Sequence, residues 1–398
     1  MKVLGIESSC DETAAAVVED GGVLLSNAVS SQMDDFVAYG GVIPEIAARS
    51  HIEAILPVVE KALDDADCTW GDIDAIGATY GPGLIGSLLV GTLTARTLAL
   101  TKNIPFYPIH HVEAHVYANF VVEEKGRKHL ALPSTQPAFP MLALIVSGGH
   151  SQLVLFRGHG DYTLLGQTQD DAIGEAFDKV AKIIGLPYPG GVSISKLAPS
   201  GDARAFTFPK ANLACPPGCT HNPNRSVTQE DIDAGRVVHG GRGHLFLRDR
   251  CHRYDFSFSG LKTAVLRTVQ AEVGVGHDFP SHQLPGRVSD ALRADIAASF
   301  QRIAVETLVD KTLLAFQDYS PASVVIAGGV AANLELRRSL QERLPIDIEY
   351  APMSLCTDNA VMIAALAYYQ TQQLPPTDPR DVEVAPSLRM EKWSKLER

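Results

Sequence analysis

The sequence predicts an α/β protein built from two similar halves. Three short apolar runs joined by tight polar turns occur near residue 3 and again near residue 142, and each triplet is followed by helix and strand patterns. The chain has 398 residues, more than one hydrophobic core usually organises, so we expect two lobes.

In the first half, apolar runs between polar turns predict strands, and longer periodic stretches predict helices. The predicted strands are 3–7, 14–19, 23–28, 75–79 and 104–109, and the predicted helices are 44–65 and 84–101. Glycines, threonines and an arginine interrupt the apolar stretch 84–100, so we expect a buried helix there and no membrane span.

The second half repeats this order. The predicted strands are 142–146, 151–156, 162–165 and 323–327, and the predicted helices are 173–184, 290–317, 331–344 and 361–369. Two facing βββαβα halves would bind a ligand in the cleft between them. By analogy of fold this is the actin, sugar kinase and heat-shock ATPase architecture. We expect an N-terminal lobe over 1–140, a C-terminal lobe over 141–373 and an extended tail over 374–398.

Composition restricts the classes of partner and compartment. The net charge is −12, so a polyanionic partner would need a local basic patch or a second protein. The chain starts directly in a predicted strand, with no leader pattern, which predicts a cytoplasmic protein. Six dispersed cysteines do not form a disulfide framework.

A histidine pair follows the strand predicted at 104–109. His111 and His115 are one turn apart on one helix face and could share a metal ion. The alternative is a helix start with solvated or core histidines. A zinc-protease motif needs H-E-x-x-H, whereas Glu113 would point away from the metal. Asp358 would complete a two-histidine, one-carboxylate site for iron(II) or zinc, unless it only caps the last predicted helix.

Polar residues also gather in three turns between predicted strands. Ser147-Gly148-Gly149 could present backbone amides to phosphate or carboxylate oxygens, and a second glycine pair precedes Asn333. The turn before residue 13 holds Asp11 and Glu12. Each of these could be a simple turn. The chain has neither a Walker A motif nor a G-x-G-x-x-G motif after a strand, which argues against a P-loop NTPase and a Rossmann dehydrogenase. Asp178 lies beyond the first turn of its predicted helix and therefore requires a partner.

Seven segments, in order along the chain, resemble the motifs of the TsaD family, the bacterial tRNA N(6)-adenosine threonylcarbamoyltransferases, formerly described as O-sialoglycoprotein endopeptidases. The segments are GIESSCDET at 5–13, HHVEAH at 110–115, SGGH at 147–150, GEAFDK at 174–179, FSFSGLKT at 256–263, GGVAAN at 328–333 and CTDN at 356–359. The resemblance runs from residue 1 to about residue 369 and is interrupted once.

The resemblance implies transfer of a threonylcarbamoyl group from threonylcarbamoyl-AMP to the exocyclic amine of adenosine 37, in tRNAs that read codons starting with A. It also implies that His111, His115 and Asp358 bind one divalent metal ion, with Fe(2+) preferred over Zn(2+). The residues implied to bind the threonylcarbamoyl-AMP or ATP are Ile145, Val146, Ser147, Gly148, Gly149, Asp178, Gly191 and Asn333. Asp11 or Glu12 is our hypothesis for the general base.

By the same resemblance, the chain would act with a TsaB-like paralogue and a TsaE-like ATPase, while a threonylcarbamoyl-AMP synthase supplies the donor. No membrane is implied. The alternative is a small-molecule kinase or O-carbamoyltransferase of the same superfold. A metalloprotease and a non-enzymatic ATP-binding scaffold are weaker alternatives.

The interruption is an insertion at about 210–253. Its cysteines and histidines could bind zinc, although their spacing is not that of a common ribbon or finger. Its arginines could contact tRNA backbone. A solvated surface insertion is the favoured interpretation. The residues concerned are Cys215, Cys219, His221, Cys251 and His252, with Arg225, Arg236, Arg242, Arg248, Arg250 and Arg253.

Overall fold

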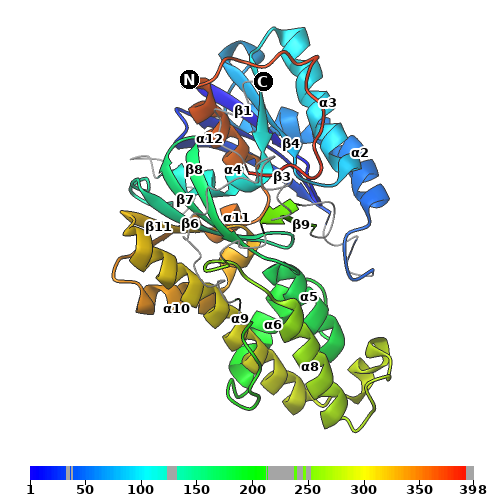
Figure 1. Ribbon diagram of the computed structural model, residues 1–398. Coiled ribbons are helices and arrows are strands. Elements are labelled where there is room, and N and C mark those ends of the chain that lie inside the picture. The colour runs from blue at the N-terminus through cyan, green and yellow to red at the C-terminus, as the bar shows by residue number, and fades with distance from the viewer. Residues whose placement is uncertain are drawn as a thin grey trace.

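Two five-stranded sheets of identical topology organise the molecule (Figure 1). The computed structural model describes residues 1–32, 36, 39–122, 132–211, 213, 237–239, 245–247 and 252–390. The strand orders are β3-β2-β1-β4-β5 and β8-β7-β6-β11-β12, in each case an antiparallel meander extended by two parallel strands. The duplicated α/β fold predicted from the sequence is confirmed.

The strands lie close to the predicted ranges. The first sheet contains β1 (Lys2–Glu7), β2 (Glu12–Glu19), β3 (Val23–Ser31), β4 (Ala75–Gly81) and β5 (Phe106–His110). The second contains β6 (Met141–Val146), β7 (Ser151–Gly158), β8 (Asp161–Gln167), β11 (Ser323–Ala327) and β12 (Ile348–Tyr350). The sequence analysis missed β12, which has only three residues. Two short strands, β9 (Val237–His239) and β10 (Leu245–Leu247), pair with each other inside the insertion.

All the predicted helices are present in the predicted order, and three further helices, at 190–197, 259–272 and 353–356, were not predicted. The helices are α2 (Pro44–Asp65), α3 (Ile85–Lys102), α4 (His111–Tyr117), α5 (Ile173–Ile184), α6 (Gly190–Leu197), α8 (Ser259–Glu272), α9 (Asp290–Tyr319), α10 (Leu334–Arg343), α11 (Met353–Cys356) and α12 (Ala360–Thr371). The helix predicted at 331–344 is present as α10, but it begins three residues later than predicted, at Leu334. A 3-10 turn, Gly329–Ala332, precedes α10, because the Asn333 side chain accepts from the Leu336 amide and restarts the helix.

The helix with the histidine pair lies where the two sheets meet. α4 contacts β6 and β11 of the second sheet, and it packs against α12, which covers the first sheet. Gly5 and Gly77 permit the approach of α12, since a Cβ on Gly5 would lie 2.3 Å from the Ala360 carbonyl oxygen. One buried cluster therefore includes Val3 of the first sheet, Ile145 of the second and Ile363 of α12. This shared core fixes α4 relative to both sheets.

The described part of the segment after α12, to residue 390, runs along the first sheet and contains no regular helix or long strand. The Thr377 amide donates to the Phe106 carbonyl, and the Ala385 amide donates to the Tyr80 carbonyl at 2.7 Å. Residues 391–398 of the predicted tail lie outside the described residues, as do Cys215, Cys219, His221 and Cys251 of the insertion. None of the helices described here combines the length and the apolar character needed to cross a bilayer.

Candidate metal centre and nucleotide cradle

The end of β5 and the start of α4 place both histidines side by side. The strand ends at His110 and the helix begins at His111, so no loop separates the sheet from the histidine pair. The His111 and His115 side chains are buried, with ring centroids 4.8 Å apart. Asp358, just before α12, brings its Oδ1 atom to 3.3 Å from His115 Nε2 and 3.6 Å from His111 Nε2. The three residues predicted as metal ligands therefore lie together.

Asp358 is not the cap of the last helix. The Asn359 side chain accepts from the Met362 amide at 3.1 Å and takes that role, which leaves Asp358 facing the histidines. Burial raises the pKa of Asp358, but His111 and His115 outweigh burial and lower this pKa to about 2. The Asp358 carboxylate is thus held in its charged, ligand-competent form.

The donor set fits a divalent metal. Both ring nitrogens of His115 are buried, and beyond the Asp358 Oδ1 atom at 3.3 Å from Nε2 neither makes a hydrogen bond, which is costly unless another group satisfies them. The ligand atoms of His111, His115 and Asp358 all lie within 4.8 Å of one another. Metal–ligand bonds of about 2.1 Å place neighbouring ligands roughly 3.0–3.4 Å apart, close to the observed distances. Two imidazoles and one carboxylate leave coordination positions open for a substrate.

Glu7 orients His111 from the opposite side. Its Oε2 atom lies 3.2 Å from His111 Nδ1 and also accepts from the Thr79 hydroxyl at 2.5 Å. Burial lowers the pKa of His111, but Asp358 and Glu7 outweigh burial and raise it to about 9. Hydrogen bonding of Nδ1 to a carboxylate leaves Nε2 as the ligand nitrogen. Glu7, at the end of β1, was not predicted as a site residue.

We expect Glu7→Gln to weaken metal binding by about 10- to 100-fold, because an amide orients the His111 ring less firmly than a carboxylate does. The measurement is metal content after dialysis against a graded chelator, with total metal determined by mass spectrometry. Glu19 lies at the C-terminal end of β2, whereas Glu7 lies at the end of β1 beside His111. Glu19→Gln is therefore the matched control. An unchanged metal affinity in Glu7→Gln would contradict the role of Glu7.

The carboxylates proposed for base catalysis lie beside the same centre. Ligand oxygens of Asp11, Glu12 and Asp358 are within 4.8 Å of one another, and Asp11 and Glu12 are both buried. Burial, Asp358 and Asp11 together raise the pKa of Glu12 to about 10. Such mutual repulsion among carboxylates favours either a shared proton or a bound cation.

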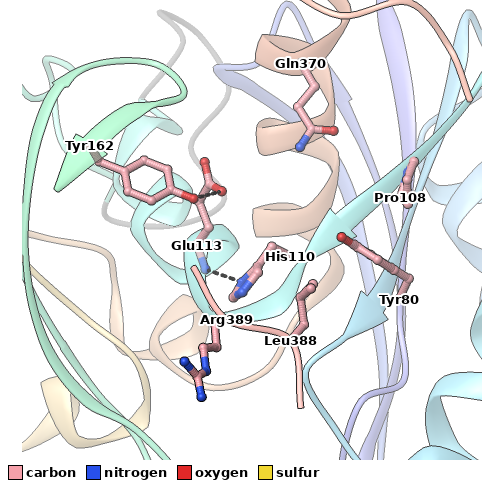
Figure 2. Close-up of a pocket in the computed structure, with 8 residues that line it drawn as sticks. All are labelled: Tyr80, Pro108, His110, Glu113, Tyr162, Gln370, Leu388 and Arg389. Atoms are coloured by element: carbon pink, nitrogen blue, oxygen red, sulfur yellow. Dashed lines mark hydrogen bonds between the residues drawn. The ribbon is translucent and has the colours of Figure 1, made fainter. Parts of the chain in front are cut away.

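Glu113 belongs neither to the group of His111, His115 and Asp358 nor to the carboxylates beside it, as the sequence spacing indicated. The Tyr162 hydroxyl donates to Glu113 Oε2 at 3.1 Å. Both residues line a cavity of about 50 Å³, together with His110 and Gln370. Figure 2 shows these side chains. The Glu113 amide donates to His110 Nδ1 at 3.3 Å. Glu113 therefore does not take the place of the glutamate that a zinc protease of the H-E-x-x-H type has beside its metal.

We call the glycine turns at 147–149, 190–191 and 328–329 the cradle, because contacts through α5 and β6 connect them. The Ser147 carbonyl accepts from the Gly174 amide at the start of α5 at 3.3 Å. Gly328, at φ 88°, approaches so closely that a Cβ would lie 2.5 Å from the Val146 carbonyl oxygen. In contrast, a Cβ on Gly148, Gly149 or Gly191 would meet no atom within 4 Å. These three glycines therefore border open space that a ligand could enter.

Asp178 and Asn333 tie further elements to the cradle. Asp178 Oδ1 accepts from the Gly190 amide at 2.7 Å, which supplies the partner that the sequence required. Asn333 Nδ2 lies 2.9 Å from the Ser195 hydroxyl of α6 and 3.0 Å from Gln301 Oε1 of α9. Ser195 and Gln301 carry no motif of their own and were missed. Ile145 and Val146 are fully buried in β6 and pair with β7, so they line the sheet beneath the Ser147 turn.

The fold and site define a class of protein: an actin-like, duplicated α/β protein that combines a candidate metal centre with a glycine-lined cradle. The chain belongs to the TsaD family, because residues 23–365 match the family model described as tRNA N6-adenosine threonylcarbamoyltransferase. It is therefore an acyltransferase of the tRNA-modifying class.

Relatives support this assignment over nearly the whole chain. The tRNA N6-adenosine threonylcarbamoyltransferase of Thermomicrobium roseum is 45% identical over 384 residues, covering 94% of this chain and 93% of the relative. That of Dehalococcoides mccartyi strain CBDB1 is 42% identical over 388 residues, covering 98% and 99%. Full-length HypF, in a phosphate- and nucleotide-bound structure, matches 94% of this chain and 56% of its own length, with TM-score 0.54 and 11% identity, a likeness of fold alone.

Proposed function

We propose that this protein transfers the threonylcarbamoyl group from threonylcarbamoyl-AMP to the exocyclic amine of adenosine 37, in tRNAs that read codons starting with A. The observation that carries the proposal is the placement of His111, His115 and Asp358 beside two further buried carboxylates, within a fold of the TsaD family. A tRNA substrate implies a cytoplasmic site of action.

His111, His115 and Asp358 would hold one divalent metal, with Fe(2+) preferred and Zn(2+) as the second choice. When bound, such an ion supplies a Lewis acid that polarises oxygen atoms of the donor. Glu7 keeps the His111 ring turned so that Nε2 faces the site, and Asp358 contributes the negative charge that attracts the cation.

The cradle would bind the adenylate of threonylcarbamoyl-AMP, or ATP in its place. Ser147, Gly148 and Gly149 offer backbone amides to phosphate oxygens, and Gly191 lies at the N-terminal end of α6. Asp178 and Asn333 fix the surrounding elements and have polar atoms suited to the ribose or base. Open space at the glycines allows the ligand to approach the backbone.

In the transfer step, the adenosine N6 forms a bond with the carbamoyl carbon, the bond from that carbon to the phosphate oxygen breaks, and AMP leaves. The amine must lose a proton, because an exocyclic adenine amine is a weak nucleophile. Asp11 or Glu12 would accept this proton, Glu12 only while a bound cation keeps it ionised, because burial, Asp358 and Asp11 raise the pKa of Glu12 to about 10. The anticodon loop is single-stranded, so its adenosine reaches the pocket without opening a duplex.

A TsaB-like paralogue would bind an apolar stripe on α2 and α3. The stripe consists of large side chains exposed at helical spacing on two packed helices: Ile52, Leu56, Ile85, Leu89, Leu93 and Leu100. An apolar surface of this kind is typical of a protein interface. The net charge of −12 gives this chain little attraction for tRNA by itself, so a partner protein would help to bind the tRNA. A TsaE-like ATPase and a threonylcarbamoyl-AMP synthase complete the proposed system.

We expect the double substitution Leu89→Asp and Leu93→Asp to weaken binding of the TsaB-like partner at least about 100-fold, because both carboxylates would be desolvated in the interface. Leu93 is 49% exposed, so the melting temperature should change little. Calorimetric titration measures the affinity. Leu334→Asp with Met353→Asp, at two exposed apolar positions elsewhere, is the matched control. Equal loss in both double variants would contradict the assigned surface.

The proposed reaction is tested by omission of tRNA. The purified protein, its partners and threonylcarbamoyl-AMP should form product only with an unmodified tRNA that contains adenosine 37. Transfer of a phosphoryl or carbamoyl group to a sugar-like acceptor without tRNA would favour the alternative kinase or O-carbamoyltransferase. Membership of the TsaD family argues against that alternative.

A further inference from the structure

The backbone of the acidic turn between β1 and β2 is attached to both helices of the apolar stripe. The Cys10 carbonyl, next to Asp11, accepts from His51 Nε2 of α2 at 3.0 Å and from the Ser87 hydroxyl of α3 at 3.2 Å. A carbonyl oxygen has two lone pairs, so one donor from each helix satisfies it fully. The turn that holds Asp11 and Glu12 is thus positioned from two sides.

The second nitrogen of His51 extends this attachment into β2 and β3. His51 is fully buried, and burial lowers its pKa, so its ring is neutral with one donor and one acceptor nitrogen. Nε2–H donates to Cys10, which makes Nδ1 the acceptor for the Thr13 hydroxyl at 2.7 Å, and Gln32 Nε2 donates in turn to Thr13 Oγ1 at 3.2 Å. Every polar atom of the ring is therefore used in holding the turn.

The α3 side makes equally close contacts with the residues before Cys10. The Ser8 hydroxyl donates to the Ser87 carbonyl at 2.8 Å, and the Leu84 amide donates to the Ser9 carbonyl at 2.8 Å. A Cβ on Gly91 would lie 2.2 Å from Ser8 Oγ, so α3 packs directly on the turn. A displacement of α3 would consequently move the turn as well.

The exposed stripe begins beside these contacts. Ile52 follows His51 on α2, and Ile85 and Leu89 flank Ser87 on α3 within one helical turn. The inward-facing donors and the outward-facing apolar side chains thus belong to the same two helical segments. A partner bound on the stripe would restrain these segments at the point where they hold the turn.

We propose that His51 and Ser87 are positioning residues that couple a protein bound on the α2/α3 stripe to the Asp11–Glu12 turn. The inference rests on the proposed function in one respect, since it takes the stripe to bind the TsaB-like paralogue. Restraint of the turn lowers the cost of placing the carboxylates for proton acceptance, an effect on the rate of the chemical step more than on tRNA affinity.

Two conservative variants separate the two nitrogens of His51. His51→Gln keeps a donor near the Nε2 position, whereas His51→Asn keeps a polar atom only near Nδ1. Amide hydrogen exchange of residues 8–12 is measured with and without the purified TsaB-like paralogue, together with single-turnover transfer to tRNA. Ser50→Ala, which removes a hydroxyl bonded only within α2, is the matched control.

For the wild type, Ser50→Ala and His51→Gln, we expect the partner to slow exchange in the turn. In His51→Asn and Ser87→Ala that slowing should be lost, and transfer should be about tenfold slower than in the wild type. The partner affinity and the KM for tRNA should stay within about twofold of the wild-type values. Ser87→Ala carries the test if His51→Asn does not fold. Wild-type exchange in both variants, or loss of partner affinity in parallel, would overturn the coupling. Failure of the wild type to transfer would overturn only the proposed function, because the exchange measurement needs no reaction.

Discussion

Replacement of both His111 and His115 by alanine is expected to abolish stoichiometric metal binding and to lower the transfer rate by at least about 100-fold. The reason is the loss of two of the three ligands at the only site where, among the described residues, histidines and a carboxylate converge. A Lewis acid supplies several kcal/mol of stabilisation, and each 1.36 kcal/mol is worth a factor of ten. Metal analysis and single-turnover transfer measure the two effects.

The control removes the same number of imidazoles elsewhere. His277 and His282 are exposed, so His277→Ala with His282→Ala should retain metal and rate. Because both side chains are buried and lie beside Glu7 and Asp358, their removal should lower the stability, so the melting temperature of the double variant is measured before its metal content. A double variant that keeps one tightly bound metal per chain would contradict the assignment of the centre.

Gly149→Val should raise KM for threonylcarbamoyl-AMP by about 100-fold without changing the melting temperature. Its backbone φ lies outside the left-handed region, and a Cβ there would meet no protein atom within 4 Å, so the fold has room for the side chain. The same space is the proposed path of the adenylate to the backbone amides. A misplacement of roughly 1 Å at a reacting centre can cost about 100-fold in rate, so kcat should fall as well.

Gly286→Val provides the comparison, because Gly286 is also exposed and has no atom within 4 Å of an added Cβ, yet lies in a 3-10 turn outside the cradle. Both variants should melt at the wild-type temperature, and only Gly149→Val should lose adenylate affinity. Equal KM values in the two variants would place the nucleotide elsewhere.

The elements with strong periodicity could be predicted from the sequence. The strands of the two meanders, before residue 31 and after residue 141, were predicted, because alternation and tight turns are local signals. Helices α2 and α5 begin and end at the predicted residues. β12 was missed because three residues carry no periodicity, and the helix at 331–344 was predicted too early because Asn333 caps α10 through its own side chain.

The site was predictable only where a residue type is unusual in its setting. His111 and His115 have a helical spacing after a strand, and Asp358 stands just before the last predicted helix. Glu7 and His51 act through contacts between segments 104 and 41 residues apart in sequence, which no local pattern records. Ser195 and Gln301 likewise become recognisable only when α6 and α9 meet Asn333.

The most direct test of the central claim is mass analysis of nucleosides from a reconstituted reaction. It contains the metal-loaded protein, the TsaB- and TsaE-like partners, a threonylcarbamoyl-AMP synthase, threonine, bicarbonate, ATP and an unmodified tRNA. We expect threonylcarbamoyladenosine at position 37, dependent on this protein and lost with His111→Ala and His115→Ala. Unmodified adenosine 37 with competent partners and bound nucleotide would contradict it.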